Sequence, residues 1–305
     1  MNRLRLNILK VLVYFDHFDH PLSASEIRSF MPSRYDEIAF ENELSSLLNE
    51  SIVFRTGEYY AIRNQPMLAK KRIAGYKAAI TQLIVAKRIA RFLSRFPYVE
   101  AIAVSGSLSK YYADENSDID FFIITSGNRL WIARTLMHLF KKLTFIMGKE
   151  HWFCMNYYID DIKMEIPEKN LFTAIEIVTL LPLEGGDGFE KFMAANSWVK
   201  NFFPFFQNSN KASELRKGFI RNAVEKILNS DFFDLLESRL MTITDKRWKK
   251  KSHSIKRTDP SKNIGMSVDK HFSKPDPRIF QEKILKQYHN RVQQLETLLD
   301  QANLN

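Results

Sequence analysis

The sequence predicts an α+β protein of several domains, with helical regions toward both ends and a small mixed sheet in a central α/β section. Its 305 residues exceed the size of one ordinary small domain. Hydrophobic residues form 45% of the chain and charged residues 26%, a balance that supplies folded cores and argues against disorder. Changes in apolar spacing divide the chain into a first domain at 1–66, a connecting helix at 67–97, an α/β domain at 98–188 and a helical C-terminal region at 189–305.

Cysteine usage and the lengths of the apolar runs indicate a cellular compartment. Cys154 is the only cysteine, so the chain forms no internal disulfide and suits a reducing interior. The N-terminal segment lacks the small-residue cleavage site of a secretory signal, and no apolar run approaches the length of a membrane span. We therefore expect a cytoplasmic protein without membrane contact. Its net charge of +10 favours polyanionic partners such as nucleotides or nucleic acid.

The first domain is predicted to contain three helices followed by a hairpin. The first helix covers about residues 4–15, and the capping box Ser23–Glu26 opens a second, short helix. A third helix covers about 36–49, and two short strands at 52–55 and 59–62 flank a Gly-containing turn. This order of elements resembles the winged helix-turn-helix modules.

Such modules often read DNA with the third helix in the major groove. Here that helix carries acidic residues and no Lys or Arg, so DNA phosphates should repel it. We therefore expect a protein-contact or scaffold role, and sequence-specific DNA binding is the less favoured alternative. His17 and His20 follow the first helix and invite a metal interpretation. No Cys or third His is nearby in sequence, so we interpret them as part of a polar loop.

Two strongly basic stretches have two interpretations each. The connecting helix at 67–97 carries many Lys and Arg residues and no acid, which suits either a solvated linker or a functional role, as a wall of the active cleft or as a nucleic-acid contact. Residues 246–257 carry seven positive charges in twelve positions. We predict a mobile, solvated loop there, with nucleic-acid contact as the alternative.

The α/β domain contains a strand–turn–strand motif with chemically useful side chains. An apolar strand at 99–105 runs into Gly106-Ser107, and a short helix is expected at 108–112. A turn at 114–117 then leads into a second strand, 118–124, which begins Asp-Ile-Asp. Asp118 and Asp120 are therefore predicted to lie two residues apart on one strand and to share a face.

Each residue of this motif suits the binding of a nucleoside triphosphate with Mg²⁺. A glycine at position 106 lets the backbone approach a phosphate closely. Ser107 adds a hydroxyl, and the free N–H groups at the following helix start favour an anion. Two carboxylates, those of Asp118 and Asp120, are oxygen ligands that hold Mg²⁺, which would neutralise the phosphates and stabilise a leaving pyrophosphate.

Gly-Ser, ten intervening residues and Asp-Ile-Asp together resemble the nucleotidyltransferase motif of the polymerase-beta-like superfamily. The resemblance covers about 100 residues, and it implies transfer of a nucleoside monophosphate from a triphosphate to a hydroxyl or phosphate on an acceptor. It also implies that Gly106 and Ser107 hold the triphosphate, while Asp118 and Asp120 bind metal. Lys110, one turn beyond Ser107, is a further candidate phosphate contact that the resemblance itself does not supply.

The sequence departs from this family at the third carboxylate, which active relatives place on a later strand. The next predicted strand, at 152–159, carries Asn156, a neutral amide that cannot act as a base. Glu165 lies on a further strand predicted at 162–166, and it could reach the site if those two strands form a hairpin. Both positions stay open at this point. Thr173, Glu176 and Thr179 form a stripe on a helix predicted at 171–181, to which we assign no chemistry.

The predicted function is therefore Mg²⁺-dependent nucleotidyl transfer from a nucleoside triphosphate to an acceptor that the sequence does not identify, whether small molecule, protein or RNA. Two alternatives remain because of the incomplete carboxylate set. One is a regulatory protein that binds a nucleotide without turning it over. The other is an interaction protein resembling the nucleotidyltransferase-type antitoxins.

Overall fold

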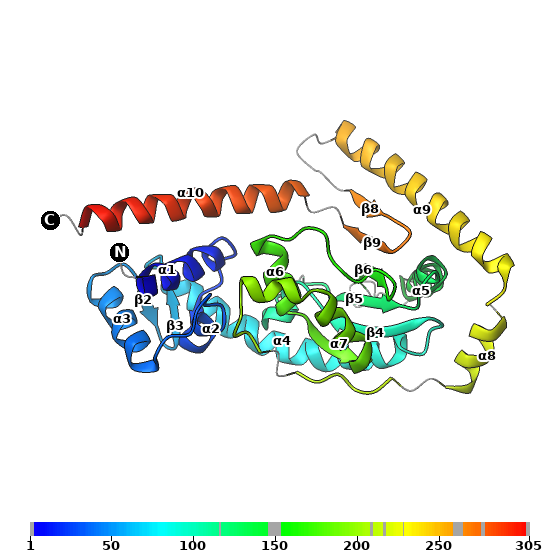
Figure 1. The fold of residues 1–305 in the computed structure, drawn as a ribbon, viewed down its shortest axis with the longest axis horizontal. Coiled ribbons are helices and arrows are strands. Elements are labelled where there is room, and N and C mark those ends of the chain that lie inside the picture. The colour runs from blue at the N-terminus through cyan, green and yellow to red at the C-terminus, as the bar shows by residue number, and fades with distance from the viewer. Residues whose placement is uncertain are drawn as a thin grey trace.

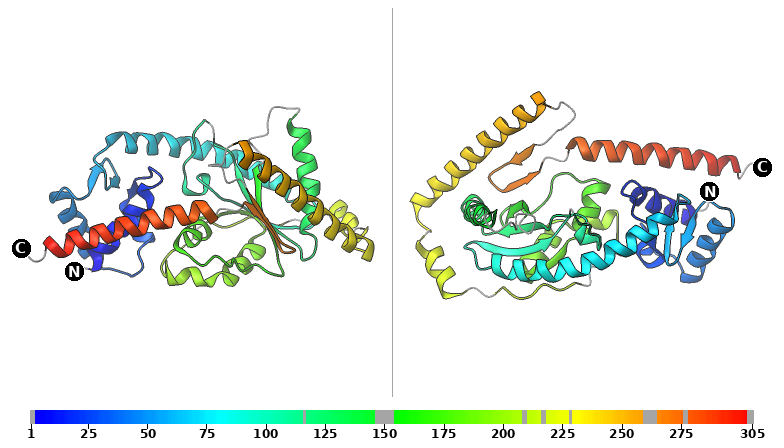
Figure 2. Two further views of the ribbon diagram at one scale, coloured as in Figure 1. Left: turned by 90° about the horizontal axis from the view of Figure 1, so that it is seen from above. Right: turned by 180° about the vertical axis from the view of Figure 1, so that it is seen from behind.

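The computed structural model of the chain describes residues 3–115, 117–145, 154–207, 210–215, 218–227, 229–258, 265–275 and 278–302. A small N-terminal unit lies at one end of the elongated molecule and a six-stranded sheet occupies the other (Figure 1). Helix α4 (Pro66–Leu93) joins the two, and helix α10 (Arg278–Ala302) runs back across the opposite side of the molecule to the N-terminal unit (Figures 1 and 2).

The N-terminal unit consists of three helices and a three-stranded antiparallel sheet of order β1-β3-β2. Its elements are α1 (Arg3–Asp16), β1 (Leu22–Ser23), α2 (Ala24–Ser29), α3 (Glu37–Asn49), β2 (Phe54–Thr56) and β3 (Tyr59–Ala61). The predicted capping box is formed, since the Ser23 hydroxyl accepts from the Glu26 amide and the Glu26 carboxylate accepts from the Ser23 amide. This small sheet suggests the winged-helix arrangement, which stays a prediction.

The central sheet has the order β7-β4-β5-β6-β9-β8 and is mixed, as predicted. Its strands are β4 (Val99–Val104), β5 (Asp120–Thr125), β6 (Cys154–Asp160), β7 (Leu181–Glu184), β8 (Met266–Val268) and β9 (Phe272–Pro275). Strands β5 and β6 pair in parallel, and helix α5 (Leu130–Phe145) lies between them in the chain; the other paired strands are antiparallel. Strand β5 lies inside the sheet, so its first residue, Asp120, is held by neighbours on both sides.

The two faces of the sheet bury different apolar clusters. Alternate residues of β5 point to opposite faces, so Phe121 and Ile123 pack with α4 and α5, whereas Phe122 packs on the other face. That second face is covered by α6 (Leu171–Val178) and α7 (Gly186–Ala195), and its apolar cluster continues into the core of the N-terminal unit. Asp120 lies on the same face as Phe122, and this is the face that bears the candidate site.

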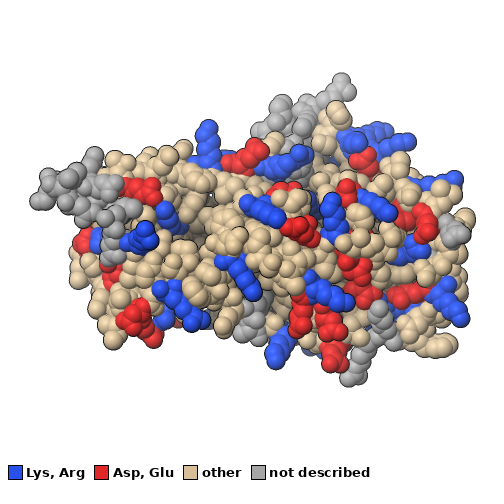
Figure 3. Space-filling view, viewed as in Figure 1, with Lys and Arg blue, Asp and Glu red and all other residues tan. Residues whose placement is uncertain are grey.

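Helix α4 corrects part of the prediction for the basic connecting helix. The guanidinium of Arg72 is buried, donates to the carbonyl of Tyr111 at 2.7 Å and pairs with Glu26 at 2.8 Å. The other basic side chains of the helix are exposed, as expected: Lys70, Lys71, Lys77, Lys87, Arg88, Arg91 and Arg95. On the face drawn in Figure 3, Lys and Arg are interspersed with Asp and Glu, so the net positive charge forms no single patch there.

The C-terminal region is mainly helical, as predicted, but it differs from the prediction at residues 246–257 and 266–275. Helix α8 (Phe219–Ile227) precedes the long helix α9, and residues 266–275 supply strands to the central sheet, which the prediction of a helical region did not include. The loop predicted at 246–257 is wrong, because α9 (Asp231–Thr258) is one continuous helix. Its sequence contains no Gly or Pro, and Lys and Arg are good helix formers. Among the described residues, no helix is long and apolar enough to cross a membrane.

Candidate active site

The Gly-Ser turn brings the backbone directly against an acidic side chain. Gly106 follows β4 with φ of +68°, a conformation that favours glycine. A Cβ atom at this position would lie 2.6 Å from Oδ2 of Asp120. The turn and the carboxylate therefore lie side by side, as the motif predicted, although 13 residues separate them in the chain.

Hydrogen bonds to the Gly106 carbonyl fix the loop that follows. Ser109 donates its hydroxyl to this oxygen at 2.8 Å, and the Lys110 ammonium donates to it at 3.2 Å. The expected short helix is a 3-10 helix, η1 (Leu108–Lys110), which begins after Ser107. The Ser107 side chain is exposed and does not cap this helix, so its hydroxyl is accessible to a ligand.

Lys110 lies at the site but already has an acidic partner. Its ammonium pairs with the Glu176 carboxylate of α6 at 2.8 Å. Glu176 in turn lines a cavity together with Gly106 and Asp120. The ion pair thus links the Gly-Ser loop to α6 across the site, and a bound phosphate would compete with Glu176 for the lysine.

The two aspartates of the motif differ in their backbone setting. Asp120 is the first residue of β5, whereas Asp118 precedes the strand, so the prediction that both lie on one strand is wrong in this detail. Both residues are partly exposed. No group of three His, Cys, Asp or Glu residues suited to a metal ion occurs in the part of the chain that the structure describes. Protein ligands to a cation at this site would therefore be few.

The structure removes the basis for choosing Glu165 as the third carboxylate. Residues 161–170 form no strand, so the hairpin predicted at 162–166 is wrong. Glu165 lies in this loop, is about half exposed and pairs with Lys169 at 2.5 Å. Asn156, the other position considered, belongs to β6 and falls at a shift in register, between the pairs Phe121–Met155 and Phe122–Tyr157. Its side chain lies outside the described part of the structure.

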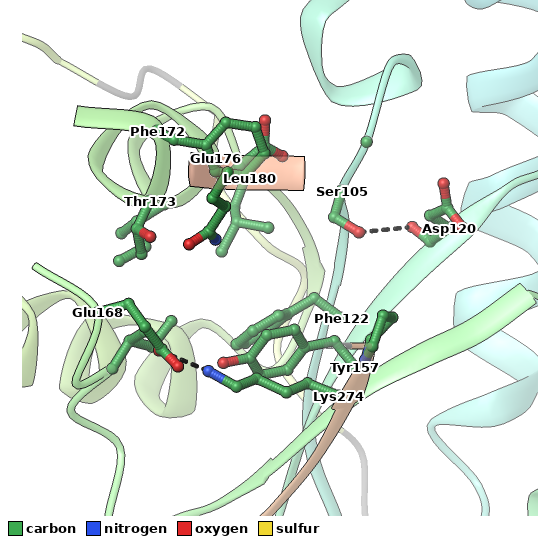
Figure 4. Close-up of a pocket in the computed structure, with 15 residues that line it drawn as sticks. Ser105, Asp120, Phe122, Tyr157, Glu168, Phe172, Thr173, Glu176, Leu180 and Lys274 are labelled. Carbon is green, nitrogen blue, oxygen red and sulfur yellow. Dashed lines mark hydrogen bonds and ion pairs between the residues drawn. The ribbon is translucent and has the colours of Figure 1, made fainter. Parts of the chain in front are cut away.

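A cavity of about 250 Å³ adjoins Gly106 and Asp120 on this face of the sheet. Asp120 lies at one side of the cavity, while Glu168 and Lys274 meet at another (Figure 4). The remaining lining comes from β4, β5, β6, α6 and the C-terminal region: Ser105, Phe122, Tyr157, Ile166, Phe172, Thr173, Glu176, Ile177, Leu180, Pro275 and Gln281.

The sequence did not identify some of the polar groups in this cavity, and we assigned no chemistry to the others. Thr173 and Glu176 share the stripe noted on α6, and their spacing was the available signal. Lys274 is buried and pairs with Glu168 at 2.5 Å, although the two are 106 positions apart in sequence. Only the pairing of β9 with β6 brings Lys274 to the site, so no local pattern could have identified it.

The surroundings of His20 are less polar than those of the polar loop that the sequence predicted. Its ring lies 5.8 Å from that of Phe15 and 6.3 Å from that of Tyr112, measured between centroids. Burial lowers the pKa of His20 to about 3, and the positive charges of Arg72 and Lys110 add to this effect. The imidazole is therefore neutral at physiological pH and lies in the contact between the N-terminal unit and the Gly-Ser loop.

Comparison with known proteins gives one match. No curated protein and no solved structure matches this chain significantly. A sequence model of a protein family matches residues 86–178, which begin in the second half of α4 and end with α6. This stretch contains the Gly-Ser turn, Asp118, Asp120 and β6. The family is described as the nucleotidyltransferase domain, and residues 86–178 of this chain are similar to it.

Proposed function

We propose that this protein is an Mg²⁺-dependent nucleotidyltransferase that moves a nucleoside monophosphate from a triphosphate to an acceptor. The observation that carries the proposal is the contact between the Gly106 backbone and the Asp120 carboxylate, where a Cβ would lie 2.6 Å from Oδ2. A phosphate on the turn and a cation on the carboxylate would be immediate neighbours there. The match of residues 86–178 to the nucleotidyltransferase domain supports the same conclusion. The division of the chain at residues 66, 97 and 188 is part of this proposal.

The residues present fit a magnesium ion whose ligands come partly from the protein and partly from the substrate. Mg²⁺ in phosphoryl-transfer sites is commonly held by one or two carboxylates together with substrate phosphates and water. Asp118 and Asp120 would supply the carboxylates, and the close approach of Gly106 leaves room beside them that any side chain would fill. When bound, the ion would neutralise charge on the transferring phosphoryl group and on the leaving pyrophosphate.

The other residues of the site would bind and orient the triphosphate. The exposed Ser107 hydroxyl donates to a phosphate oxygen, and Gly106 allows the backbone to approach. Lys110 exchanges Glu176 for a phosphate, which breaks a link between the Gly-Ser loop and α6. This exchange would leave the Glu176 carboxylate in the cavity wall without its lysine partner.

The test uses the full chain with Asp118→Asn and Asp120→Asn. Calorimetry should show nucleoside triphosphate binding that needs Mg²⁺ in the wild type and is at least about tenfold weaker in each variant, because each loses a ligand charge. Asp245→Asn, a change on α9 outside the site, is the matched control and should bind normally. Equal binding with and without Mg²⁺ would contradict the proposal, and so would a large loss of thermal stability in both variants without metal.

A second candidate function is nucleotide binding without transfer. It is favoured by the absence of a third clustered carboxylate among the described residues and by Asn156 in the strand beside Asp120. Release of pyrophosphate separates the two candidates. Wild-type protein with Mg²⁺, each triphosphate and a mixture of small-molecule, protein and RNA acceptors should release pyrophosphate if the first candidate holds. Binding without release, across all acceptor mixtures, would favour the second.

We further propose that the N-terminal unit acts as a winged-helix-like scaffold that contacts protein. Helix α3 carries Glu37, Glu41 and Glu43 and no basic residue, so a DNA backbone would be repelled. Its carboxylates also pair within the unit, since Glu43 accepts from Arg5 at 3.1 Å. Absence of sequence preference in duplex DNA binding is the expected result, and selection of one sequence from a random pool would contradict it.

A further inference from the structure

We propose that the cavity beside Asp120 is the subsite for the nucleobase of the triphosphate, and that Glu168, Lys274 and Thr173 recognise the polar edge of that base. The inference rests on the proposed function and adds the location of the base and the residues that select it. Two of these residues lie outside α6, in the loop after β6 and in the C-terminal strand β9.

The position of the cavity decides what kind of occupant it takes. Its wall includes Gly106 and Asp120, which are the proposed anchors of the triphosphate and the metal. A group that enters the cavity therefore either is attached to those phosphates or faces them. The cavity volume of about 250 Å³ suits one ring system with a sugar, and a folded polymer does not enter it.

The walls of the cavity favour a flat, apolar-faced ring. The rings of Phe122 and Tyr157 lie 4.7 Å apart between centroids and are tilted by 35°. Phe172 contributes a third ring from α6, on the opposite side of the cavity (Figure 4). Aromatic side chains bind nucleobases by stacking, because each base presents a flat π face.

The polar groups of the cavity form a donor–acceptor pair. The ammonium of Lys274 lies 2.5 Å from Oε2 of Glu168, and about 6.0 Å from the ring of Tyr157. The Lys274 side chain is buried, whereas that of Glu168 is about 29% exposed, so the lysine loses most of its hydration and the ion pair contributes little to stability. A role in recognition accounts better for the position of the buried ammonium. Lys274 has further N–H groups to donate, and Glu168 has further lone pairs to accept with. A nucleobase offers a ring nitrogen or carbonyl to the first and an amino or imino N–H to the second.

Thr173 supplies an independent observation. Its side chain is about 6% exposed and lines the cavity, and its hydroxyl has no hydrogen-bond partner among the described residues. Leaving a buried hydroxyl without a partner is costly, so a ligand atom that bonds to it would remove the cost. Thr179, six residues further on at the C-cap of α6, is buried to a similar degree, but its hydroxyl donates to the Ile175 carbonyl at 2.7 Å. The two threonines therefore differ in hydrogen bonding. Only the Thr173 hydroxyl lacks a partner among the described residues, and this difference indicates a ligand.

The experiment compares inorganic tripolyphosphate with the four common nucleoside triphosphates, each titrated with Mg²⁺ into the full-length protein. Tripolyphosphate measures the phosphate and metal site alone. We expect at least one triphosphate to bind about tenfold tighter than tripolyphosphate, the scale of one stacked base. Thr173→Val and Glu168→Gln should each lower that advantage about fivefold or more while tripolyphosphate binding stays unchanged.

Matched controls come from the same segments of the chain. Thr179→Val removes a satisfied hydroxyl from the same helix, and Glu165→Gln changes an exposed carboxylate of the same loop. Neither should alter the ratio of the two affinities. Thr173→Val preserves the shape of the side chain, so the thermal stability of this variant should remain near that of wild type. The test therefore still stands if Glu168→Gln folds poorly.

Three results would overturn the inference. If tripolyphosphate binds with Mg²⁺ but no triphosphate binds more tightly, the base lies elsewhere and the proposed function stands. If a triphosphate binds more tightly but Thr173→Val and Glu168→Gln leave the ratio unchanged, the cavity does not hold the base. If tripolyphosphate fails to bind at all, the phosphate site itself is wrong, and the proposed function fails together with the inference.

Discussion

Gly106 is the residue whose replacement separates backbone strain from site chemistry. Gly106→Ala forces a side chain into a positive-φ conformation and against Asp120 Oδ2. Gly57 is a matched control, because it has a similar φ of +63° and open space around the position of a Cβ. We expect both alanine variants to lose about 1 kcal/mol of unfolding free energy from the backbone alone. Triphosphate binding should be lost only in Gly106→Ala, and calorimetry on both variants measures the difference.

His20 predicts a pH dependence of stability. The pKa of His20 in the folded protein is about 3, below the ordinary value of 6.5 for histidine, so between these pH values the unfolded chain binds a proton that the folded chain does not. The contribution of His20 to unfolding free energy is therefore present at neutral pH and falls as the pH drops from about 6.5 toward 3. His20→Phe should show a smaller loss over this interval. His289, an exposed residue on α10, provides the control variant His289→Phe.

Denaturant unfolding of these three proteins at several pH values tests this point. The difference between wild type and His20→Phe isolates the histidine from carboxylates that titrate in the same range. If the unfolding free energy of the wild type changes with pH in parallel with that of His20→Phe, the imidazole is accessible to protons in the folded state.

At the scale of elements, Arg72 fixes the position of the Gly-Ser loop relative to α4 and the N-terminal unit. Its guanidinium bonds to Tyr111 in that loop and to Glu26 on α2, and lies 5.6 Å from the ring centre of Tyr59. Arg72→Met leaves Glu26 and a carbonyl without their partner, so we expect a loss of roughly 2–3 kcal/mol of unfolding free energy. Arg88→Met, an exposed change on the same helix, should stay within about 0.5 kcal/mol of wild type.

Arg72→Met is also expected to weaken triphosphate binding at saturating Mg²⁺, because the loop after Ser107 loses its hydrogen bond to the Arg72 guanidinium. Chemical denaturation measures the stability and calorimetry measures the affinity. Full affinity in a folded Arg72→Met protein would show that the loop is held by its own hydrogen bonds to Gly106 alone.

Helix α9 illustrates where element-level prediction from sequence fails. The run of positive charge at 246–257 predicts a mobile, solvated loop. In the structure the run is helical, and local pairs reduce the repulsion: Lys249 bonds to Asp245 at 2.7 Å, and the Lys251 ammonium lies 4.7 Å from the ring centre of Trp248. The N-terminal part of α9 also packs on α5, where buried Glu237 accepts from the backbone amides of Trp131 and Ile132 at 2.6 and 2.9 Å. Packing at one end thus supports a helix that charge patterning alone disfavours.

At the scale of the whole molecule, α10 ties the C-terminal region to the N-terminal unit. Arg291 pairs with Asp16 at 2.6 Å, Lys10 pairs with Glu296 at 2.9 Å, and the rings of Tyr14 and Tyr288 lie 5.9 Å apart between centroids. Figure 2 shows this helix passing over the unit while α4 joins the same parts on the other side. The molecule is therefore connected at two places, and α10 also carries Gln281 into the cavity.

Truncation after residue 277 tests this arrangement. Removal of α10 exposes an apolar side of α1 and removes Gln281 from the cavity lining, so we expect the melting temperature to fall by several degrees and triphosphate affinity to drop. The double variant Lys10→Gln and Arg291→Gln removes the ion pairs but keeps the apolar contacts, and it should cost only about 1 kcal/mol or less per pair. Thermal melts of both proteins, with calorimetry on the truncated one, measure these effects. An unchanged melting temperature after truncation would show that α10 contributes nothing to the N-terminal unit.

The sequence by itself determined the motif and its local geometry. The Gly-Ser turn, the strand before it and the carboxylate after it are set by short-range rules of backbone conformation and strand alternation, so Gly106, Ser107 and Asp120 could be assigned from their spacing. The family match at residues 86–178 includes these three positions. Local patterns also predicted the elements of the N-terminal unit, because helix caps and turns depend on neighbours within a few residues.

Only the tertiary structure decided which residues complete the cavity. Lys274 reaches Glu168 because β9 joins the sheet beside β6, and Arg72 is buried because the N-terminal unit packs on α4. Pairing of distant strands and burial of a charge depend on contacts between segments far apart in the chain, and local sequence spacing carries no signal for them. The hairpin expected to carry Glu165 failed for the same reason: the neighbour that β6 takes is β9, from about a hundred residues later, and residues 162–166 form no strand.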